Sequence, residues 1–150
     1  MSTDLSTIDG VISSLYSAIS FEKGGEPNYE LFKSLFHKSA TIFQPIEDTD
    51  GVLKPVNVDD FVNSFSRTIE QEGILETGAT EVEIERKTIS FRRIANVFSS
   101  YEFTLNGAKT PLARGINTFQ LVNDASRWWI VSLTWDRAKP GESLTMETEK

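Results

Sequence analysis

Two segments near the C-terminus, residues 114–123 and 128–136, constrain the fold most, because both faces of each predicted strand are apolar. Strand side chains point alternately to opposite sides. By this alternation, one side carries Gly115, Asn117, Phe119, Leu121, Trp129, Val131, Leu133 and Trp135, and the other carries Ile116, Val122, Trp128 and Ile130. Helices of the same chain covering one face, and a second subunit covering the other, would explain this pattern. We therefore expect an internal pocket and a homodimer through the outer sheet face, which also includes Phe98.

Three amphipathic helices are predicted ahead of the sheet, because apolar residues recur there at helical spacing. Residues suited to cap these helices precede each of them: Ser6 or Thr7, then Asn28, then Asn57. The apolar positions are Ile8, Val11, Ile12, Leu15 and Ile19, then Leu31, Phe32 and Leu35, then Val58, Phe61, Val62, Phe65 and Ile69. We expect the three helices to cover one face of the sheet.

The strand pattern begins at residues 40–44, before Pro45, with a short return strand at 52–55. After Gly78, Val82 and Ile84 have one parity and Ile89 and Phe91 the other, which predicts a bulge near residues 86–88. Turns are predicted at 93–96, 106–107 and 123–126. Helices followed by an antiparallel meander indicate an α+β fold in a single domain, residues 1–137. We expect the polar tail, residues 138–150, to be mobile.

Composition excludes several classes of function. The sequence has no cysteine and one histidine, His37, so disulfides, thiolate catalysis and a multi-histidine metal site are excluded within one chain. We expect neither a metal nor a cofactor. A net charge of −7 repels phosphate backbones, so nucleic acid is not an expected partner. No segment approaches the roughly 20 apolar residues of a membrane span, and no leader pattern opens the chain, so we expect a soluble cytoplasmic protein.

The order of elements, with residues 35–41, 100–102 and 115–119, resembles the nuclear transport factor 2-like superfamily. That superfamily includes ketosteroid isomerase, scytalone dehydratase and the polyketide-cyclase-like proteins, and the resemblance spans about residues 4–136. It implies a cone of the cystatin-like α+β type, in which three helices close a strongly curved antiparallel sheet around an apolar pocket. Many such proteins pair through the outer face of the sheet.

The catalytic positions that the resemblance implies are changed in this sequence. The isomerase's general base, an aspartate before a proline, corresponds to Gln44 here, and its protonated oxyanion aspartate corresponds to Asn117. Neither amide titrates. Its first-helix tyrosine corresponds to Leu15, one residue before Tyr16. The dehydratase depends on two histidines. We therefore expect neither of these reactions.

The candidate ligand site combines polar and aromatic residues that strand parity and the resemblance place in the cone. Its members are Tyr16, Gln44, Ser99, Tyr101, Asn117, Phe119 and Trp135. In the alternative interpretation, the polar groups are satisfied inside a filled core and Trp135 is a structural plug. Other polar residues have simpler interpretations. His37 can interact with a helix C-terminus, Arg114 with solvent or a dimer partner, and Glu81, Glu83 and Glu85 can form a solvated strand face.

Three functions remain open. We favour a binding protein that holds a small, largely apolar ligand in the cone. The first alternative is an enzyme of the isomerase, cyclase or dehydratase type, in which Tyr101, Tyr16 or His37 replaces the missing acid and base. The second is a dimeric interaction module without a ligand. An open cavity containing a group with a strongly shifted pKa would favour the enzyme, whereas a filled cone would exclude both ligand-dependent functions.

Overall fold

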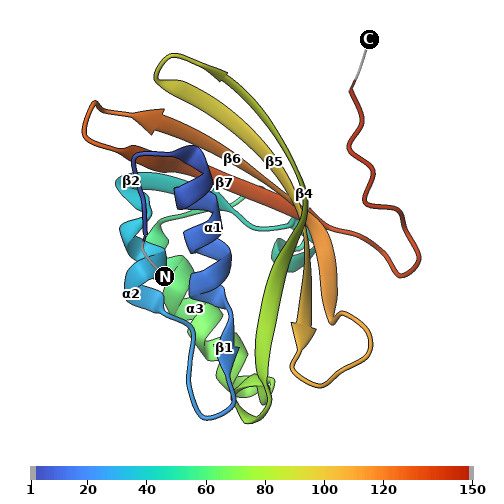
Figure 1. Cartoon of the computed structure of the whole chain (residues 1–150). Helices are drawn as coiled ribbons and strands as arrows, with labels where there is room; N and C mark the ends of the chain where they lie inside the picture. The colour runs from blue at the N-terminus through green and yellow to red at the C-terminus, as the bar shows by residue number, and fades with distance from the viewer. Residues whose placement is uncertain (1–2, 149–150) are drawn as a thin grey trace.

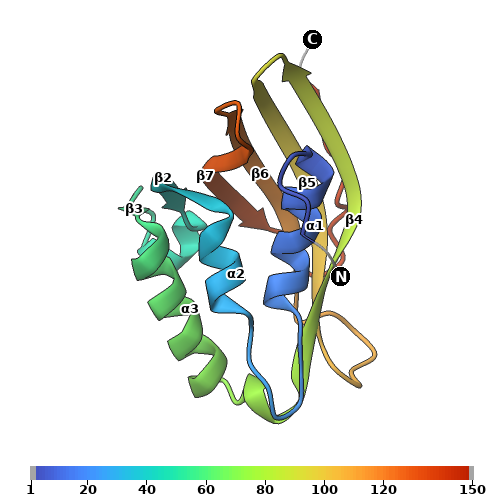
Figure 2. The same cartoon turned by 60° about the vertical axis from the view of Figure 1, so that its left-hand side comes forward.

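The computed structural model describes residues 3–148, and it places three helices on one side of a strongly curved sheet (Figures 1 and 2). The helices are α1 (Ile8–Ile19), α2 (Tyr29–Ser34) and α3 (Val58–Gln71). The side chains of Thr7, Asn28 and Asn57 accept hydrogen bonds from backbone N–H groups in the first turns of α1, α2 and α3, respectively. These bonds satisfy donors that a helix leaves unpaired, so each helix starts where its capping residue predicts.

Seven strands form one sheet in the order β1-β4-β5-β6-β7-β2-β3. All neighbouring strands are antiparallel except β2 and β7, which run parallel. The predicted α+β cone is confirmed, with this one parallel pair. The strands are β1 (Phe21–Glu22), β2 (Phe36–Phe43), β3 (Pro55–Val56), β4 (Gly78–Phe91), β5 (Ile94–Leu105), β6 (Ala113–Asn123) and β7 (Trp128–Arg137), with short 3-10 helices at Ile46–Thr49 and Ile74–Glu76.

Some element boundaries differ from the prediction. Strand β2 begins at Phe36, earlier than the predicted residue 40, and the return strand is Pro55–Val56 rather than residues 52–55. The bulge in β4 falls at Ile84, because Glu83 pairs with Tyr101 while Glu85 pairs with Ser100. The chain turns at Arg92, whose φ of 50° is left-handed. Residues 138–148 of the predicted tail contain no helix or strand, and residues 149 and 150 lie outside the described residues. The tail's mobility stays a prediction.

A second bulge, in β7, overturns the predicted outward orientation of two large side chains. Gln120 pairs with Ser132 and Leu121 with Ile130, so Val131 has no partner and the alternation shifts by one residue. Trp128 and Ile130 are consequently buried in the core, at 8% and 0% exposure. Trp129 pairs with Val122 and turns to the outer face. Strict alternation along β7 was therefore wrong for these residues.

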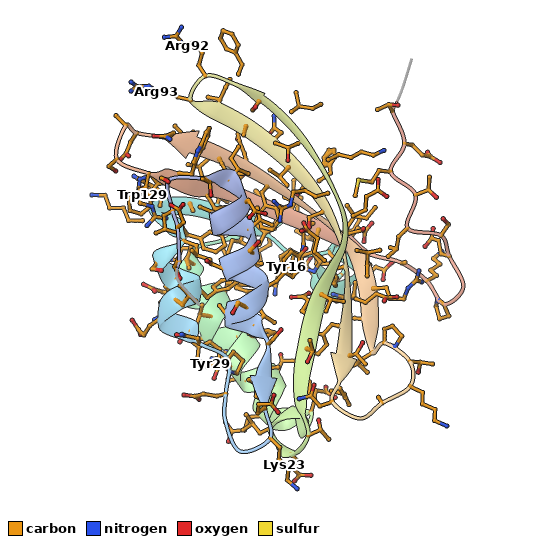
Figure 3. All side chains as sticks on the ribbon, viewed as in Figure 1. Tyr16, Lys23, Tyr29, Arg92, Arg93 and Trp129 are labelled. Carbon is orange, nitrogen blue, oxygen red and sulfur yellow. The ribbon has the colours of Figure 1, made fainter. Side chains whose placement is uncertain are left out.

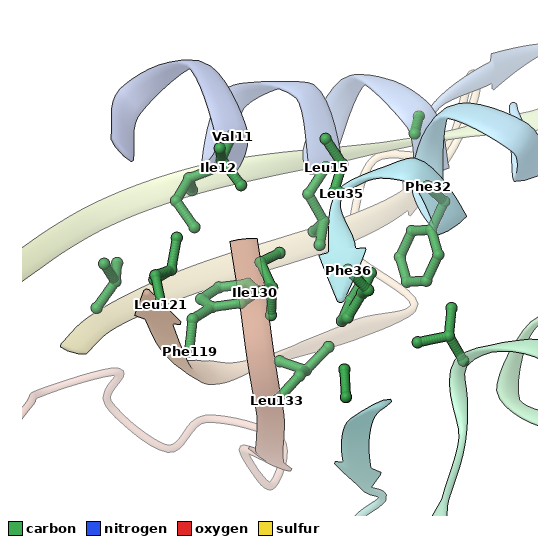
Figure 4. Packing of buried hydrophobic residues seen from close by; sticks show 14 of the residues in the cluster. Val11, Ile12, Leu15, Phe32, Leu35, Phe36, Phe119, Leu121, Ile130 and Leu133 are labelled. Atoms are coloured by element: carbon green, nitrogen blue, oxygen red, sulfur yellow. The ribbon is translucent and has the colours of Figure 1, made fainter. Parts of the chain in front are cut away.

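The core is packed between the helices and the inner face of the sheet (Figure 4). Helix α1 contributes Val11, Ile12 and Leu15, and α2 contributes Phe32. Residues of β6 and β7, including Phe119, Leu121, Ile130 and Leu133, face these helices. Each such side chain stabilises the fold by about 1.5 to 3 kcal/mol on burial. A smaller cluster of Phe21, Ile69, Ile74 and Ala79 packs separately. Side chains next to both clusters line the cavity described below.

Candidate functional site

A cavity of about 640 Å³ lies between α1, α3 and the inner face of the sheet. Its size suits a small organic ligand. The apolar lining includes the aromatic rings of Phe61, Phe103 and Trp135, and the ring of Trp135 lies edge-on to that of Phe61 at 5.6 Å between centroids. Polar groups also line the cavity: Gln44, Ser64, Thr68, Tyr101 and Asn117, with the charged residues Asp48, Glu72, Glu81 and Arg137. The cone is therefore an open site rather than a completely filled core.

The structure brings four of the seven candidate site residues to the cavity: Gln44, Tyr101, Asn117 and Trp135. Tyr16, on α1, points toward the sheet (Figure 3) and lies behind Asn117. Ser99 is fully buried next to Tyr16, and Phe119 is fully buried in the core. These last three residues do not line the cavity, so they can influence a ligand there only through their neighbours.

A series of hydrogen bonds, buried from Asn117 to Ser99 and partly buried at Glu83, supports the polar wall of the cavity. The Nδ2 of Asn117 donates to the hydroxyl of Tyr16 at 3.0 Å, and that hydroxyl lies 2.7 Å from the Oγ of Ser99. The Ser99 hydroxyl donates its single hydrogen to Oε2 of Glu83 at 2.5 Å. Tyr16 must therefore be the donor to Ser99. The chain runs in one direction and holds the Asn117 amide in a defined orientation.

Arg86 completes this chain at its charged end. Its guanidinium donates to both carboxylate oxygens of Glu83, at 2.7 to 3.1 Å, and to Oδ1 of Asp9 at 2.9 Å. Hydrogen bonding to Glu83 raises the pKa of Arg86, so the guanidinium stays charged. Glu83 is therefore a partly buried residue that holds Arg86, and Arg86 ties the start of α1 to β4 through Asp9, which contradicts the interpretation of Glu83 as part of a solvated face. Glu85, after the bulge, is exposed as that interpretation requires.

Glu81 is the site residue that sequence reasoning missed. It lies on β4 opposite Phe103, and its side chain lines the cavity. The carboxyl borders the cavity and is otherwise packed against protein, and this desolvation raises the pKa of Glu81 to about 8. Among residues 3–148, no side chain forms a hydrogen bond or ion pair with the carboxyl. The cavity thus contains a carboxyl that is mostly protonated at neutral pH and has no protein partner.

Tyr101 places a second polar group on the same wall. Its hydroxyl forms no hydrogen bond with another described residue, and burial raises its pKa above the ordinary value, so it stays protonated. Gly115 makes room for this hydroxyl, since a Cβ there would lie 2.9 Å from the Tyr101 oxygen and 2.2 Å from a backbone oxygen. A side chain at position 115 would therefore displace both the hydroxyl and the neighbouring strand.

Charged groups of opposite sign meet at the cavity's edge. The Nη2 of Arg137, near the end of β7, is paired with the Oδ1 of Asp48, in the 3-10 helix that follows β2. Glu72, which directly follows α3, also contributes to the lining of this cavity. A second hollow, of about 380 Å³, lies next to this cavity and shares Gln44, Asp48 and Phe61 with it. The lining of the main cavity thus contains three acidic residues, Asp48, Glu72 and Glu81, and one basic residue, Arg137.

His37 and Arg114 lie outside the cavity. The Nδ1 of His37 accepts a hydrogen bond from the backbone N–H of Ser39 at 3.0 Å, and its ring meets that of Trp129 edge-on. The guanidinium of Arg127 lies over the ring of Trp129, with its carbon 3.6 Å from the ring centroid. Arg114 pairs with Glu102 at 3.4 Å. Neither residue lines the cavity, so neither contacts a ligand bound there.

Within residues 3–148, no three His, Asp or Glu side chains converge in the way that a metal ion requires. In that same part of the chain, no helix is long and apolar enough to cross a membrane. The cytoplasmic location stays a prediction.

Comparison with known proteins identifies the fold. No protein-family model and no curated protein matches the sequence. A protein of unknown function with a cystatin-like fold from Nostoc punctiforme superposes with a TM-score of 0.68 at 9% identity, covering 92% of both chains. A nuclear transport factor 2-like protein of unknown function from Shewanella baltica gives 0.59 at 15% identity, covering 86% of this chain and 89% of that one. A candidate ketosteroid isomerase from Shewanella frigidimarina gives 0.56 at 16% identity, covering 84% and 91%. This chain thus has the cone fold of the nuclear transport factor 2-like superfamily. At these identities the likeness defines the fold alone.

Proposed function

We propose that the protein binds a small, largely apolar molecule in the cone cavity, with the polar end of the ligand against Gln44, Tyr101 and Asn117. One observation carries the proposal: the side chains of Gln44 and Tyr101, which form no hydrogen bond with another of residues 3–148, line a largely apolar cavity of about 640 Å³ together with Asn117. A buried polar group without a partner costs on the order of 1 to 3 kcal/mol, so a ligand or water must meet these groups. A ligand that meets them with complementary groups recovers that free energy.

The hydrogen bonds of Asn117 support a binding role over a purely structural one. Its Nδ2 is held by the hydroxyl of Tyr16, and its side chain still lines the cavity. A residue that is held from behind and presented to a cavity is pre-organised for recognition, because its rotamer is already ordered before binding. The surrounding rings of Phe61, Phe103 and Trp135 would bury the apolar part of the ligand.

Calorimetric titration with naphthylethanol tests this proposal. The compound combines an apolar bicyclic body with one hydroxyl and is small enough for the cavity. We expect saturable binding to the wild type and at least a tenfold loss of affinity in Ala113→Phe, which places a ring inside the cavity. Gln120→Phe is the matched control, because Gln120 lies on the same strand but is exposed. Equal binding by both variants, or no binding to the wild type, would contradict the proposal.

Proton transfer is a second candidate function, favoured by Glu81. A carboxyl with a pKa of about 8 can donate and accept a proton near neutral pH. Glu81 and Tyr101 share the cavity, whereas His37 lies outside it and Tyr16 lies behind Asn117. Deuterium uptake beside the carbonyl of tetralone, followed by NMR, measures this activity. Uptake should be lost in Glu81→Gln. An uptake equal to that in buffer would argue against catalysis while leaving binding intact.

We also propose that two copies of the chain pair through the outer face of the sheet. Large apolar side chains of β4 and β5 are exposed in the single chain, namely Val82, Ile84, Ile89, Phe91, Ile94 and Phe98. Phe91 pairs with Ile94 at the end of this hairpin, close to Ile89, and a group of large exposed apolar side chains is uncommon on a monomer. The hairpin tip, at Arg92 and Arg93 (Figure 3), is basic in a chain whose net charge is −7, so an acidic surface of a second copy would complement it.

A further inference from the structure

The carboxyl of Glu81 indicates which chemical class of ligand the cavity binds. Its carboxyl faces the cavity from β4, and no described residue between 3 and 148 supplies it with a cation or a hydrogen-bond donor. The next inward-facing carboxylate on the same strand, Glu83, is saturated by Arg86 and Ser99. The two carboxyl groups on this face of β4 therefore differ: that of Glu83 is fully hydrogen-bonded within the protein, whereas that of Glu81 is available to a ligand.

The charges around Glu81 favour a positively charged partner. The one basic residue in the cavity lining, Arg137, is already paired with Asp48. Glu72 adds a further negative charge. A ligand carboxylate would meet repulsion from these groups, whereas a cation would meet attraction that the low dielectric of the cavity strengthens. The net charge of −7 over the whole chain acts in the same direction.

The hydrogen-bond acceptors that line the cavity also suit a ligand that donates hydrogen bonds. Glu81 offers two carboxylate oxygens, and Asn117, with one amide hydrogen donated to Tyr16, keeps its Oδ1 as an acceptor and its second amide hydrogen as a donor. An ammonium group has three donors and no acceptor. The aromatic lining supplies ring faces, on which a cation is also stabilised.

We propose that the ligand of the cavity is an apolar molecule carrying a protonated amine, with the carboxylate of Glu81 as its counter-ion and the aromatic lining around its apolar body. This inference rests on the proposed ligand-binding function and specifies the chemical class of the ligand. Amines of this class keep their proton throughout the neutral pH range.

Binding of such a ligand must release a proton. Below pH 8 the carboxyl of the free protein is mostly neutral. The ammonium keeps its own proton and stabilises the ionised carboxylate, so the carboxyl proton leaves to solvent. The other titratable groups facing this region are Tyr16 on α1, Asp48 after β2, Glu72 after α3, Glu83 on β4, Tyr101 on β5 and Arg137 on β7. Burial raises the pKa of both tyrosines, so they stay neutral from pH 6 to 8.

The test compares three probes with the same apolar body: naphthylethylamine, naphthylethanol and naphthylacetate. Each is titrated into the protein at pH 6, 7 and 8, in phosphate and in MOPS buffer, whose different ionisation enthalpies report proton release. We expect the amine affinity to rise by up to tenfold for each pH unit, with close to one proton released at pH 6. The alcohol should release none, and the acetate should bind weakest.

Variants assign the effect to Glu81. Glu81→Gln should abolish the proton release and lower the amine affinity at pH 8 by at least tenfold, while the affinity for naphthylethanol changes less than twofold. Glu85→Gln, on the exposed side of the same strand, is the matched control and should behave as wild type. Circular dichroism checks the folding of each variant, and proton release by the wild type remains decisive if Glu81→Gln does not fold.

The outcomes separate this inference from the proposed function. Binding of the alcohol without preference for the amine, or amine binding without proton release, would overturn the amine inference and leave the cavity as a ligand site. Failure of all three probes to bind would overturn both. An amine that binds with equal proton release to Glu81→Gln would show that another group is its counter-ion, which also contradicts the inference.

Discussion

Replacing Glu81 with glutamine should remove a pH dependence from the stability of the fold. The pKa of Glu81 rises from 4.5, its ordinary value, to about 8 in the folded protein. The folded state therefore binds this proton more tightly than the unfolded state does. The resulting stabilisation is fully present below pH 4.5 and is lost as the pH rises through about 8. Glutamine is neutral at every pH, so the variant has no such loss.

The two pKa values determine the size of the effect. At about 1.4 kcal/mol per pH unit, the difference between 4.5 and about 8 corresponds to an upper limit of roughly 5 kcal/mol. Water in the open cavity screens the carboxylate, so we expect about 2 to 4 kcal/mol between pH 4.5 and pH 9. Glu81→Gln should resemble the wild type near pH 4.5 and exceed it increasingly toward pH 9.

Urea unfolding of both proteins at five values from pH 5 to pH 9 measures this difference. The other titratable groups are present in both proteins, and their effects cancel when the free energy of unfolding of the wild type is subtracted from that of the variant. Glu85→Gln is the control, because its carboxyl is exposed. If the curves for wild type and Glu81→Gln run parallel from pH 5 to pH 9, the carboxyl of Glu81 is not desolvated and the reasoning fails.

Three further predictions concern the hydrogen-bond chain, the outer face and the core. Tyr16→Phe removes the hydroxyl between Asn117 and Ser99 and should lower the free energy of unfolding, measured in urea, by about 1 to 3 kcal/mol. An unchanged free energy of unfolding would contradict these hydrogen bonds. Phe98→Asp should convert a dimer to a monomer by light scattering without loss of the helical circular dichroism signal, and an unchanged mass would argue against pairing at this face. Ile130→Asp should instead abolish cooperative unfolding, because Ile130 is buried in the core, and a folded monomer would contradict that placement.

The helices and the general order of strands could be predicted from the sequence, because their signals are local. Apolar residues recur at helical spacing from Ile8 to Ile19, and Thr7 precedes them as a cap. This pattern predicts a helix with one buried face. Asn57 and the apolar stripe after it predict α3 in the same way. These patterns depend on residues three or four apart, so no knowledge of distant contacts is needed.

The side on which strand residues lie was less predictable, because one extra residue reverses every later side chain. Val131 is such a residue, and it moves Trp128 and Ile130 into the core. Glu81 and Glu83 alternate as residues of a solvated strand do. Only the curvature of the sheet and the position of Arg86 show that Glu81 faces a cavity and that Glu83 forms a partly buried ion pair. Contacts between α1 and β4, such as Asp9 with Arg86, leave no trace in local sequence patterns.

The three tryptophans provide the most direct test of the claim that the cone holds a ligand. Trp135 lines the cavity, Trp128 is buried in the core and Trp129 lies on the outer face. The indole N–H signals of isotope-labelled protein can be followed by NMR while naphthylethanol is added. Ring currents from a ligand in the cavity should shift the Trp135 signal in a saturable manner and leave that of Trp129 unchanged. A shift confined to Trp129, or no saturable shift at all, would contradict binding in the cone.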